Sequence, residues 1–166
     1  FGVNREISRE DFCRRIHNNT VEEVLNKVSV KKGDVFFIEA GTLHAIGAGI
    51  LICEIQQNSN TTYRVYDYGR RDAQGKLREL HIEKALAVAR LSPSKPQRWD
   101  DKRYAAGDAE HRLLASCPYF TAEHYRCRGA TSVFADESTF ISLLCLEGEG
   151  TAEDGEGRIS FRKGES

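Results

Sequence analysis

Short runs of β-branched and aromatic residues, separated by turns rich in Gly and Asp, make up most of the chain after Val28. The first runs are "KVSVKKGDVFFIEAG", "GILICEIQ" and "TYRVYDYG", and similar alternating segments follow residue 110. Such side chains fit a pleated, half-buried surface, whereas Gly and Asp adopt the conformations of tight turns. The pattern predicts a mainly β protein of short strands, with five or six antiparallel strands after residue 110.

Helical signals are fewer and more local. Ser8 and Asp11 have the spacing of a helix N-cap, and Thr20 and Glu23 have the spacing of a capping box. Apolar residues recur at helical spacing after both caps, and "LHIEKALAVARL" also has a helical composition. We therefore expect three helical segments, over residues 9–17, 21–27 and 80–91.

A change of composition divides the chain. Residues 92–109, "SPSKPQRWDDKRYAAGDA", are rich in proline and charge, which is typical of a linker. We expect residues 1–91 and 110–166 to form separate domains on either side of it. A weak repeat, "VKKGDVFFI" in the first and "FRKGES" in the second, suggests that the two β units are related. "DAQGK" at 72–76 is expected to be a surface turn.

Composition excludes several classes of function. The formal net charge of -1 leaves no electrostatic footprint for nucleic acid or an anionic membrane, and no apolar run approaches 18 residues. The five cysteines are odd in number and never arranged as C-x-x-C, which argues against a disulfide framework and favours the cytoplasm. The chain starts at Phe1, contains no Met and stops within a strand-like pattern, so we expect it to be part of a longer protein.

The spacing around His44 is the first candidate for chemistry. Five residues separate Gly33 from Glu39, and Gly41 precedes His44 by three positions. The glycines allow sharp backbone turns that direct the histidine. This spacing resembles the second conserved motif of the cupin superfamily, G-x5-P-x-G-x2-H, with Glu39 in place of the usual proline. The resemblance implies that His44 is the last ligand of a metal held inside a small jelly-roll barrel.

The end of the chain resembles a second cupin. "LEGEGTAEDGEGRISFRKGE" is similar to the back half of the first cupin motif running into the start of the second. No H-x-H precedes Glu147, so this second unit is expected to bind no metal. The resemblance implies two cupin units, the first incomplete at its N-terminal side and the second truncated at its C-terminal end.

Longer blocks give a more specific resemblance. "AGTLHA", "EIQQNSNTTYRVYDYGR", "RELHIEKA" and "SCPYF" occur in this order along the chain. They resemble the short bacterial form of the type I mannose-6-phosphate isomerase family, and the similarity extends over essentially the whole chain. Members interconvert mannose 6-phosphate and fructose 6-phosphate through a cis-enediol, with one bound zinc ion.

The resemblance also implies roles for individual residues. His44 matches the family's final zinc ligand, and Arg64 matches its catalytic arginine. The other zinc ligands of the family precede the helical insert that residues 1–27 resemble, so they are expected upstream of Phe1. We therefore expect this chain alone to be inactive and to hold zinc poorly, because one imidazole does not make a tight site.

Chemistry agrees with these roles. A catalytic zinc needs three protein ligands and an open position, and an arginine adds a permanent cation with a planar fork suited to an enediolate or a phosphate. Asn60 stands where family members often carry Asp, so it cannot act as a base. Glu54 precedes the QQNS block. Both are expected to lie near the sugar phosphate as substrate-binding residues.

Other interpretations stay open. The chain could belong to a non-catalytic cupin that binds a sugar phosphate, or to an iron-dependent cupin oxygenase, although the QQNS and TYRVYDY block argues against the latter. Cys13 and His17, four residues apart, form either a metal pair or an ordinary exposed helix face, and the second is expected. His81, just before a helix, is expected to be a cap or a surface residue. The oligomeric state is not predicted.

Overall fold

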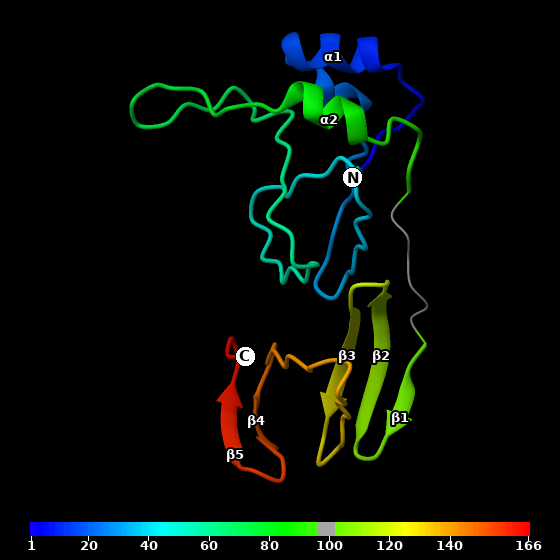
Figure 1. Ribbon diagram of the computed structural model, residues 1–166, viewed down its shortest axis with the longest axis vertical. Coiled ribbons are helices and arrows are strands. Elements are labelled where there is room, and N and C mark those ends of the chain that lie inside the picture. The colour runs from blue at the N-terminus through cyan, green and yellow to red at the C-terminus, as the bar shows by residue number, and fades with distance from the viewer. Residues whose placement is uncertain (96–101) are drawn as a thin grey trace. The chain divides into compact units, whose positions relative to one another are not determined.

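The computed structural model of the chain describes residues 1–95 and 102–166 (Figure 1). Within these ranges the regular structure is mainly β, with two short α helices and one 3-10 helix. No helix there is long and apolar enough to cross a membrane. The elements are α1 (Arg9–His17), η1 (Val21–Val24), α2 (Ile82–Val88), β1 (Tyr104–Ala106), β2 (Ala109–Ser116), β3 (Thr121–Cys127), β4 (Glu149–Glu153) and β5 (Arg158–Arg162).

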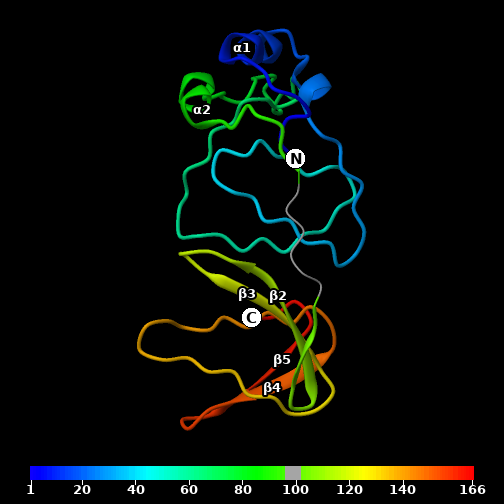
Figure 2. The same ribbon diagram turned by 90° about the vertical axis from the view of Figure 1, so that its right-hand side faces the viewer.

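The helices enclose a hydrophobic cluster. The N-terminal segment, α1 and η1 supply its fully buried side chains, and α2 covers it with Ile82 and Leu86. Figures 1 and 2 show α1 and α2 side by side. The helical spacing predicted for the apolar residues of 9–17 and 80–91 is thereby confirmed. The buried members are Val3, Ile7, Phe12, Ile16, Val21 and Val24.

Only one of the two predicted caps forms. The Ser8 hydroxyl accepts a hydrogen bond from the Asp11 N–H at 3.1 Å, and α1 covers the predicted residues 9–17. Thr20 makes no side-chain cap, and the helix predicted over 21–27 is a single 3-10 segment that ends at Val24. The capping box was wrong because the Glu23 carboxylate instead accepts from Arg15 Nη1, at 2.9 Å.

Residues near the N-terminus connect segments that are distant in sequence. Val3 forms one antiparallel bridge with Leu25 and one parallel bridge with Pro93. The amide Nδ2 of Asn26 lies 2.9 Å from the carbonyl oxygens of both Val3 and Ser94. These contacts join the segment near Val3 to the residues that follow η1 and to those that follow α2.

The strands expected between residues 28 and 68 do not form in the structure. Among the described residues, that region pairs with no strand, and a single bridge between Arg71 and Leu77 follows it along the chain. β-Branched composition favours an extended backbone, but a strand also needs a neighbouring segment to accept its hydrogen bonds. The bridge closes the predicted surface turn at 72–76, where Gly75 N–H donates to the Asp72 carbonyl at 2.9 Å.

Two sheets are present in the described residues. One has three strands in the order β1-β2-β3, and the other is the antiparallel hairpin β4-β5 (Figure 1). No strand forms between β3 and β4, so the expectation of five or six strands after residue 110 was too high. β1 lies within the predicted linker 92–109, of which residues 96–101 are outside the described residues.

The chain divides into two compact units by its internal contacts. One consists of Phe1–Tyr104 with His111–Arg126, and the other of Ala105–Glu110 with Cys127–Ser166. The predicted domains 1–91 and 110–166 therefore stay a prediction. All residues proposed for chemistry from the sequence lie in the first unit.

Candidate functional site

His44 follows a tight turn that begins at Glu39. The Thr42 N–H donates to the Glu39 carbonyl at 3.0 Å, and Gly41 within the turn has φ +83°. That conformation is unfavourable for a residue with a Cβ. The exposed His44 ring has its Nδ1 2.9 Å from the Thr42 carbonyl oxygen. A carbonyl only accepts, so Nδ1 is the donor in this contact, and Nε2, on the far side of the ring, takes no part in it.

The end of α2 holds this turn in place. The Arg90 N–H donates to the Gly41 carbonyl at 2.9 Å, and the Arg90 guanidinium pairs with the Glu39 carboxylate. On the other side of the turn, the Gly2 N–H donates to the Leu43 carbonyl at 2.7 Å. Glu39 therefore has a partner that proline, the usual residue in this motif, would lack.

The donor set around His44 fits one position of a zinc site. A histidine that donates through one ring nitrogen to a backbone carbonyl presents the other to a metal, which is the usual arrangement of zinc-bound imidazole. A zinc site needs three or four such ligands. In the part of the chain that the structure describes, no group of three or more His, Cys, Asp or Glu side chains lies close enough to hold a metal. These residues alone do not form a zinc site.

Arg64 is held at the other end of α2. Its backbone N–H lies 3.2 Å from Nδ1 of His81, and its carbonyl accepts from the His81 N–H at 2.8 Å. Its Nη1 lies 3.4 Å from the Glu79 carbonyl, a long contact, and the side chain is only partly buried. Val65, the next residue, packs against the hydrophobic cluster. The backbone of Arg64 is thus fixed while its guanidinium is accessible.

Asp67 gives the Arg64 segment a buried negative charge. Its Oδ1 pairs with Arg70 and lies 3.5 Å from Nη1 of Arg78, and Asp67 is only 7% exposed. The hydrogen bond from Arg70 lowers the pKa of Asp67, burial opposes this, and the charges of Arg78 and Arg64 lower the pKa further. Its second oxygen, Oδ2, is buried with no hydrogen-bond partner in the described residues. Asp67 is therefore ionised at neutral pH amid several arginines.

The two remaining predicted site residues are not brought into a cluster. Glu54 and Asn60 are both exposed. Neither contacts His44 or Arg64 through a hydrogen bond or ion pair that the structure describes. Their roles stay predictions.

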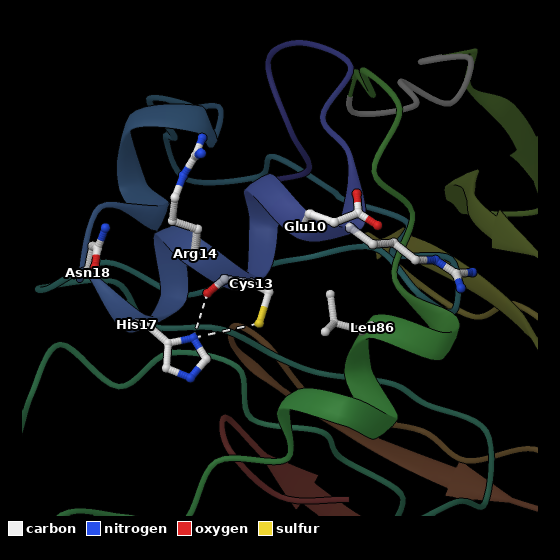
Figure 3. A pocket seen from close by; sticks show the side chains of 7 residues that line it. Glu10, Cys13, Arg14, His17, Asn18 and Leu86 are labelled. Atoms are coloured by element: carbon white, nitrogen blue, oxygen red, sulfur yellow. Dashed lines mark hydrogen bonds between the residues drawn. The ribbon is translucent and has the colours of Figure 1, made fainter.

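A shallow pocket of about 560 Å³ lies elsewhere, between α1 and α2 (Figure 3). Figure 3 shows the His17 ring folded back on its own helix, where Nδ1 lies 2.8 Å from the Cys13 carbonyl and 3.6 Å from its sulfur. This local contact fits the expectation that Cys13 and His17 lie on an ordinary helix face. The pocket includes neither His44 nor Arg64, so it is separate from the candidate site. Its lining residues are Arg9, Glu10, Cys13, Arg14, His17, Asn18 and Leu86.

Three residues around the site were not identified from the sequence. Arg90 and Asp67 were given no role, and His81 was expected to be a cap or a surface residue. His81 does occupy the N-cap position of α2, but its side chain makes no cap because it accepts from Arg64. The "RELH" block next to α2 was the available signal, since histidine is not among the preferred N-cap residues.

Comparison with known proteins supports the family resemblance found in the sequence motifs. The mannose-6-phosphate isomerase ManA of Bacillus subtilis is 40% identical over 158 residues, which is 95% of this chain and 50% of that protein. The mannose-6-phosphate isomerase of Streptococcus mutans is 36% identical, over 95% of this chain and 49% of that protein. The chain thus spans about half the length of these curated relatives. No family model matches the chain.

The fold gives the same result. The crystal structure of the mannose 6-phosphate isomerase from Bacillus subtilis aligns with a TM-score of 0.82 and 30% identity, covering 98% of this chain and 51% of that chain. The expected mainly β fold of the cupin type is confirmed by this match. The resemblance found in the motifs is confirmed as well. Over nearly its whole length, the chain is therefore related to the mannose-6-phosphate isomerases, of which it spans about half.

Proposed function

We propose that the whole protein containing this chain interconverts mannose 6-phosphate and fructose 6-phosphate. The observation that carries the proposal is the 40% identity to ManA over 95% of the chain, a stretch long enough to include both His44 and Arg64. The substrate is a sugar phosphate, and neither nucleic acid nor a membrane is a partner. The reducing environment favoured by the cysteine content supports the cytoplasm as its location.

The isomerisation moves hydrogen between neighbouring carbons without any external oxidant. A base removes the proton from C2 of the aldose, the C1 carbonyl oxygen gains a proton, and a cis-enediol results. Return of a proton to C1, with loss of the proton on the C2 oxygen, completes the ketose. Negative charge develops on the C1 oxygen in the first step and on the C2 oxygen in the second. We assign stabilisation of that charge to the Arg64 guanidinium, a permanent cation whose planar fork matches two adjacent oxygens.

We further propose that His44 is one ligand of a single catalytic zinc ion. The support is its Nδ1 contact with the Thr42 carbonyl, which leaves Nε2 available to a metal. The described residues supply no complete set of donors, so the remaining ligands are assigned to sequence outside them. The C-terminal region, residues 110–166, is proposed to bind no metal. Glu54 and Asn60 are proposed to contact the substrate.

The test uses the whole protein with mannose 6-phosphate and a coupled assay for fructose 6-phosphate. Turnover is expected, together with loss of activity on chelation and recovery on addition of zinc. Glucose 6-phosphate, which differs in configuration at C2, is the control substrate. Binding of mannose 6-phosphate with no turnover in the zinc-loaded protein would instead identify a non-catalytic sugar-phosphate-binding cupin. Absence of turnover, together with iron as the metal retained by the purified protein, would point to a different class of cupin enzyme.

A further inference from the structure

We propose that His81 is a positioning residue for Arg64, acting through an unprotonated Nδ1 that accepts the Arg64 backbone N–H. The proposal rests on the proposed function, because it gives Arg64 a catalytic role. It adds a second residue to that role, from a segment 17 positions further along the chain.

The contact between the two residues is reciprocal. The Arg64 N–H lies 3.2 Å from His81 Nδ1, and the His81 N–H donates to the Arg64 carbonyl at 2.8 Å. In a paired strand both bonds would involve backbone groups. Here no strand is paired at Arg64 in the described residues, and an imidazole nitrogen takes the place of the missing carbonyl. Both backbone polar groups of Arg64 are therefore satisfied by one residue.

His81 is attached to a helix that packs on the hydrophobic cluster. His81 is the N-cap of α2, and its carbonyl accepts the first helical hydrogen bond from the Ala85 N–H at 2.9 Å. Ala85 is buried, while Ile82 and Leu86 pack against the hydrophobic cluster. A residue whose neighbours are fixed by a core transmits that order to the group it binds. The Arg64 backbone is thus attached to the helix and not to a free loop.

The side chain of His81 is directed toward this contact. A preferred N-cap residue would use its side chain to accept from the first turn of the helix, but His81 makes no such bond. Its ring lies 6.2 Å from the Tyr63 ring at a tilted angle, which restricts its orientation next to Arg64. The Arg64 side chain also reaches the same segment, with Nη1 3.4 Å from the Glu79 carbonyl. Residues 79–81 therefore contact both the backbone and the guanidinium of Arg64.

Three substitutions separate a positioning role from simple packing. His81→Asn places an amide oxygen at the same number of bonds from Cα as Nδ1, so it keeps the acceptor. His81→Gln moves the acceptor one bond further out, and His81→Ala removes it. His17→Asn is the matched control, because His17 lies on α1 and its ring contacts only its own helix among the described hydrogen bonds.

The first measurement is hydrogen exchange at the Arg64 amide, which does not depend on activity. Protection is expected in the wild type, in His81→Asn and in His17→Asn, and at least a tenfold faster exchange is expected in His81→Ala and His81→Gln. Equal exchange in wild type and His81→Ala would overturn the proposed bond. Thermal unfolding of each variant shows whether a loss of protection reflects local change or a failure to fold. If His81→Ala does not fold, His81→Gln, which displaces the acceptor, decides the matter: exchange as slow as in the wild type would overturn the proposed bond.

The second measurement is steady-state kinetics of the whole protein. A small misplacement of a catalytic group costs about 10²-fold in rate, so we expect kcat to fall about 10- to 100-fold in His81→Ala with KM nearly constant. His81→Asn should recover kcat to within about threefold of wild type. A loss of kcat as large in His81→Asn as in His81→Ala would refute the positioning role.

Two further results separate this proposal from the proposed function. His81→Ala in an Arg64→Ala background should cause no additional loss, because the two residues act through one group. Absence of turnover in the wild type would reject the proposed function and, with it, the role of His81 in that reaction. The exchange pattern would still establish or exclude the bond to Arg64. If the Arg64 amide is protected in the wild type and loses that protection in His81→Ala while kcat stays unchanged, the bond exists but the positioning role is rejected.

Discussion

Gly41 lies directly against the carbonyl oxygen of Val88, the last residue of α2, and a Cβ at position 41 would overlap that oxygen. Gly41 also has φ +83°, which only glycine adopts easily. The turn that presents His44 therefore approaches the end of α2 too closely for any side chain at position 41. The Arg90 N–H bond to the Gly41 carbonyl, at 2.9 Å, depends on this approach.

Replacing Gly41 should cost more stability than replacing Gly33. Gly33 has φ +90°, but a Cβ there would meet nothing within 4 Å. Gly33→Ala should therefore cost only the conformational term, about 1–2 kcal/mol. Gly41→Ala adds the clash with Val88 and should exceed that value. Urea unfolding of both variants provides the measurement, and equal losses would show that the close approach to α2 is unimportant.

Ser8 and Thr20 should respond differently to alanine. Ser8→Ala removes the hydroxyl that accepts from the Asp11 N–H, and loss of such an N-cap costs about 1 kcal/mol. Thr20 caps nothing with its side chain, so Thr20→Ala should change the free energy of unfolding by less than about 0.5 kcal/mol. Chemical denaturation of the two variants checks this. A cost for Thr20→Ala as large as that for Ser8→Ala would restore the capping box that the sequence suggested.

Asp67 should make stability depend on pH in acid. Its folded pKa lies below the usual value of about 3.9, chiefly because Arg70 donates to it. A carboxyl with a lowered folded pKa contributes stability above its unfolded pKa, and this contribution disappears as pH falls through the folded pKa. Asp67→Asn should thus be less stable than wild type at pH 7, and the difference should shrink below about pH 4.

The matched control for Asp67 is Asp72→Asn, at an exposed turn. Asn retains an oxygen that can accept from the Gln74 and Lys76 N–H groups, as Oδ1 of Asp72 does now at 3.0 and 2.8 Å. Its stability difference from wild type should be small at both pH values. A stability difference for Asp67→Asn that is constant from pH 7 to pH 3 would show that the charge of Asp67 is not the source of its effect.

Arg64→Ala should lower kcat of the whole protein far more than it changes KM. If the guanidinium faces the forming enediolate, its contribution is larger in the transition state, and loss of such a contact costs about 10²–10³ in rate. Arg64→Lys keeps the charge without the fork and should recover only part of the rate. Arg71→Ala, which removes a nearby exposed arginine that donates to the Gly75 carbonyl, is the control. A change confined to KM would move Arg64 to substrate binding.

Zinc content should depend on His44 in the whole protein but not in this chain. A single imidazole does not hold zinc through dialysis, so the isolated chain should retain much less than one equivalent. The whole protein should retain one equivalent, which His44→Ala should reduce and His17→Ala should not. Elemental analysis after dialysis measures both. Two tightly held ions in the whole protein would contradict the proposal that residues 110–166 bind no metal.

The sequence determined those features that depend on neighbours along the chain. The residues Ser8, Phe12 and Ile16 were enough to predict α1 with its cap and its buried face, because capping and helical periodicity act within a few positions. The turn at 72–76 was predicted for the same reason. The motif blocks around His44 and Arg64 were specific enough to identify the related proteins without coordinates.

Only the tertiary structure decided which distant segments meet. Composition predicted strands between residues 28 and 68, but pairing requires a partner elsewhere in the chain, and none occurs in the described residues. The pairing of Glu39 with Arg90 and the bond between Arg64 and His81 span 51 and 17 residues. Both follow from α2 packing on the hydrophobic cluster, which brings its two ends against the His44 turn and the Arg64 segment. No local pattern encodes that placement, because it arises from burial of apolar surface contributed by several segments at once.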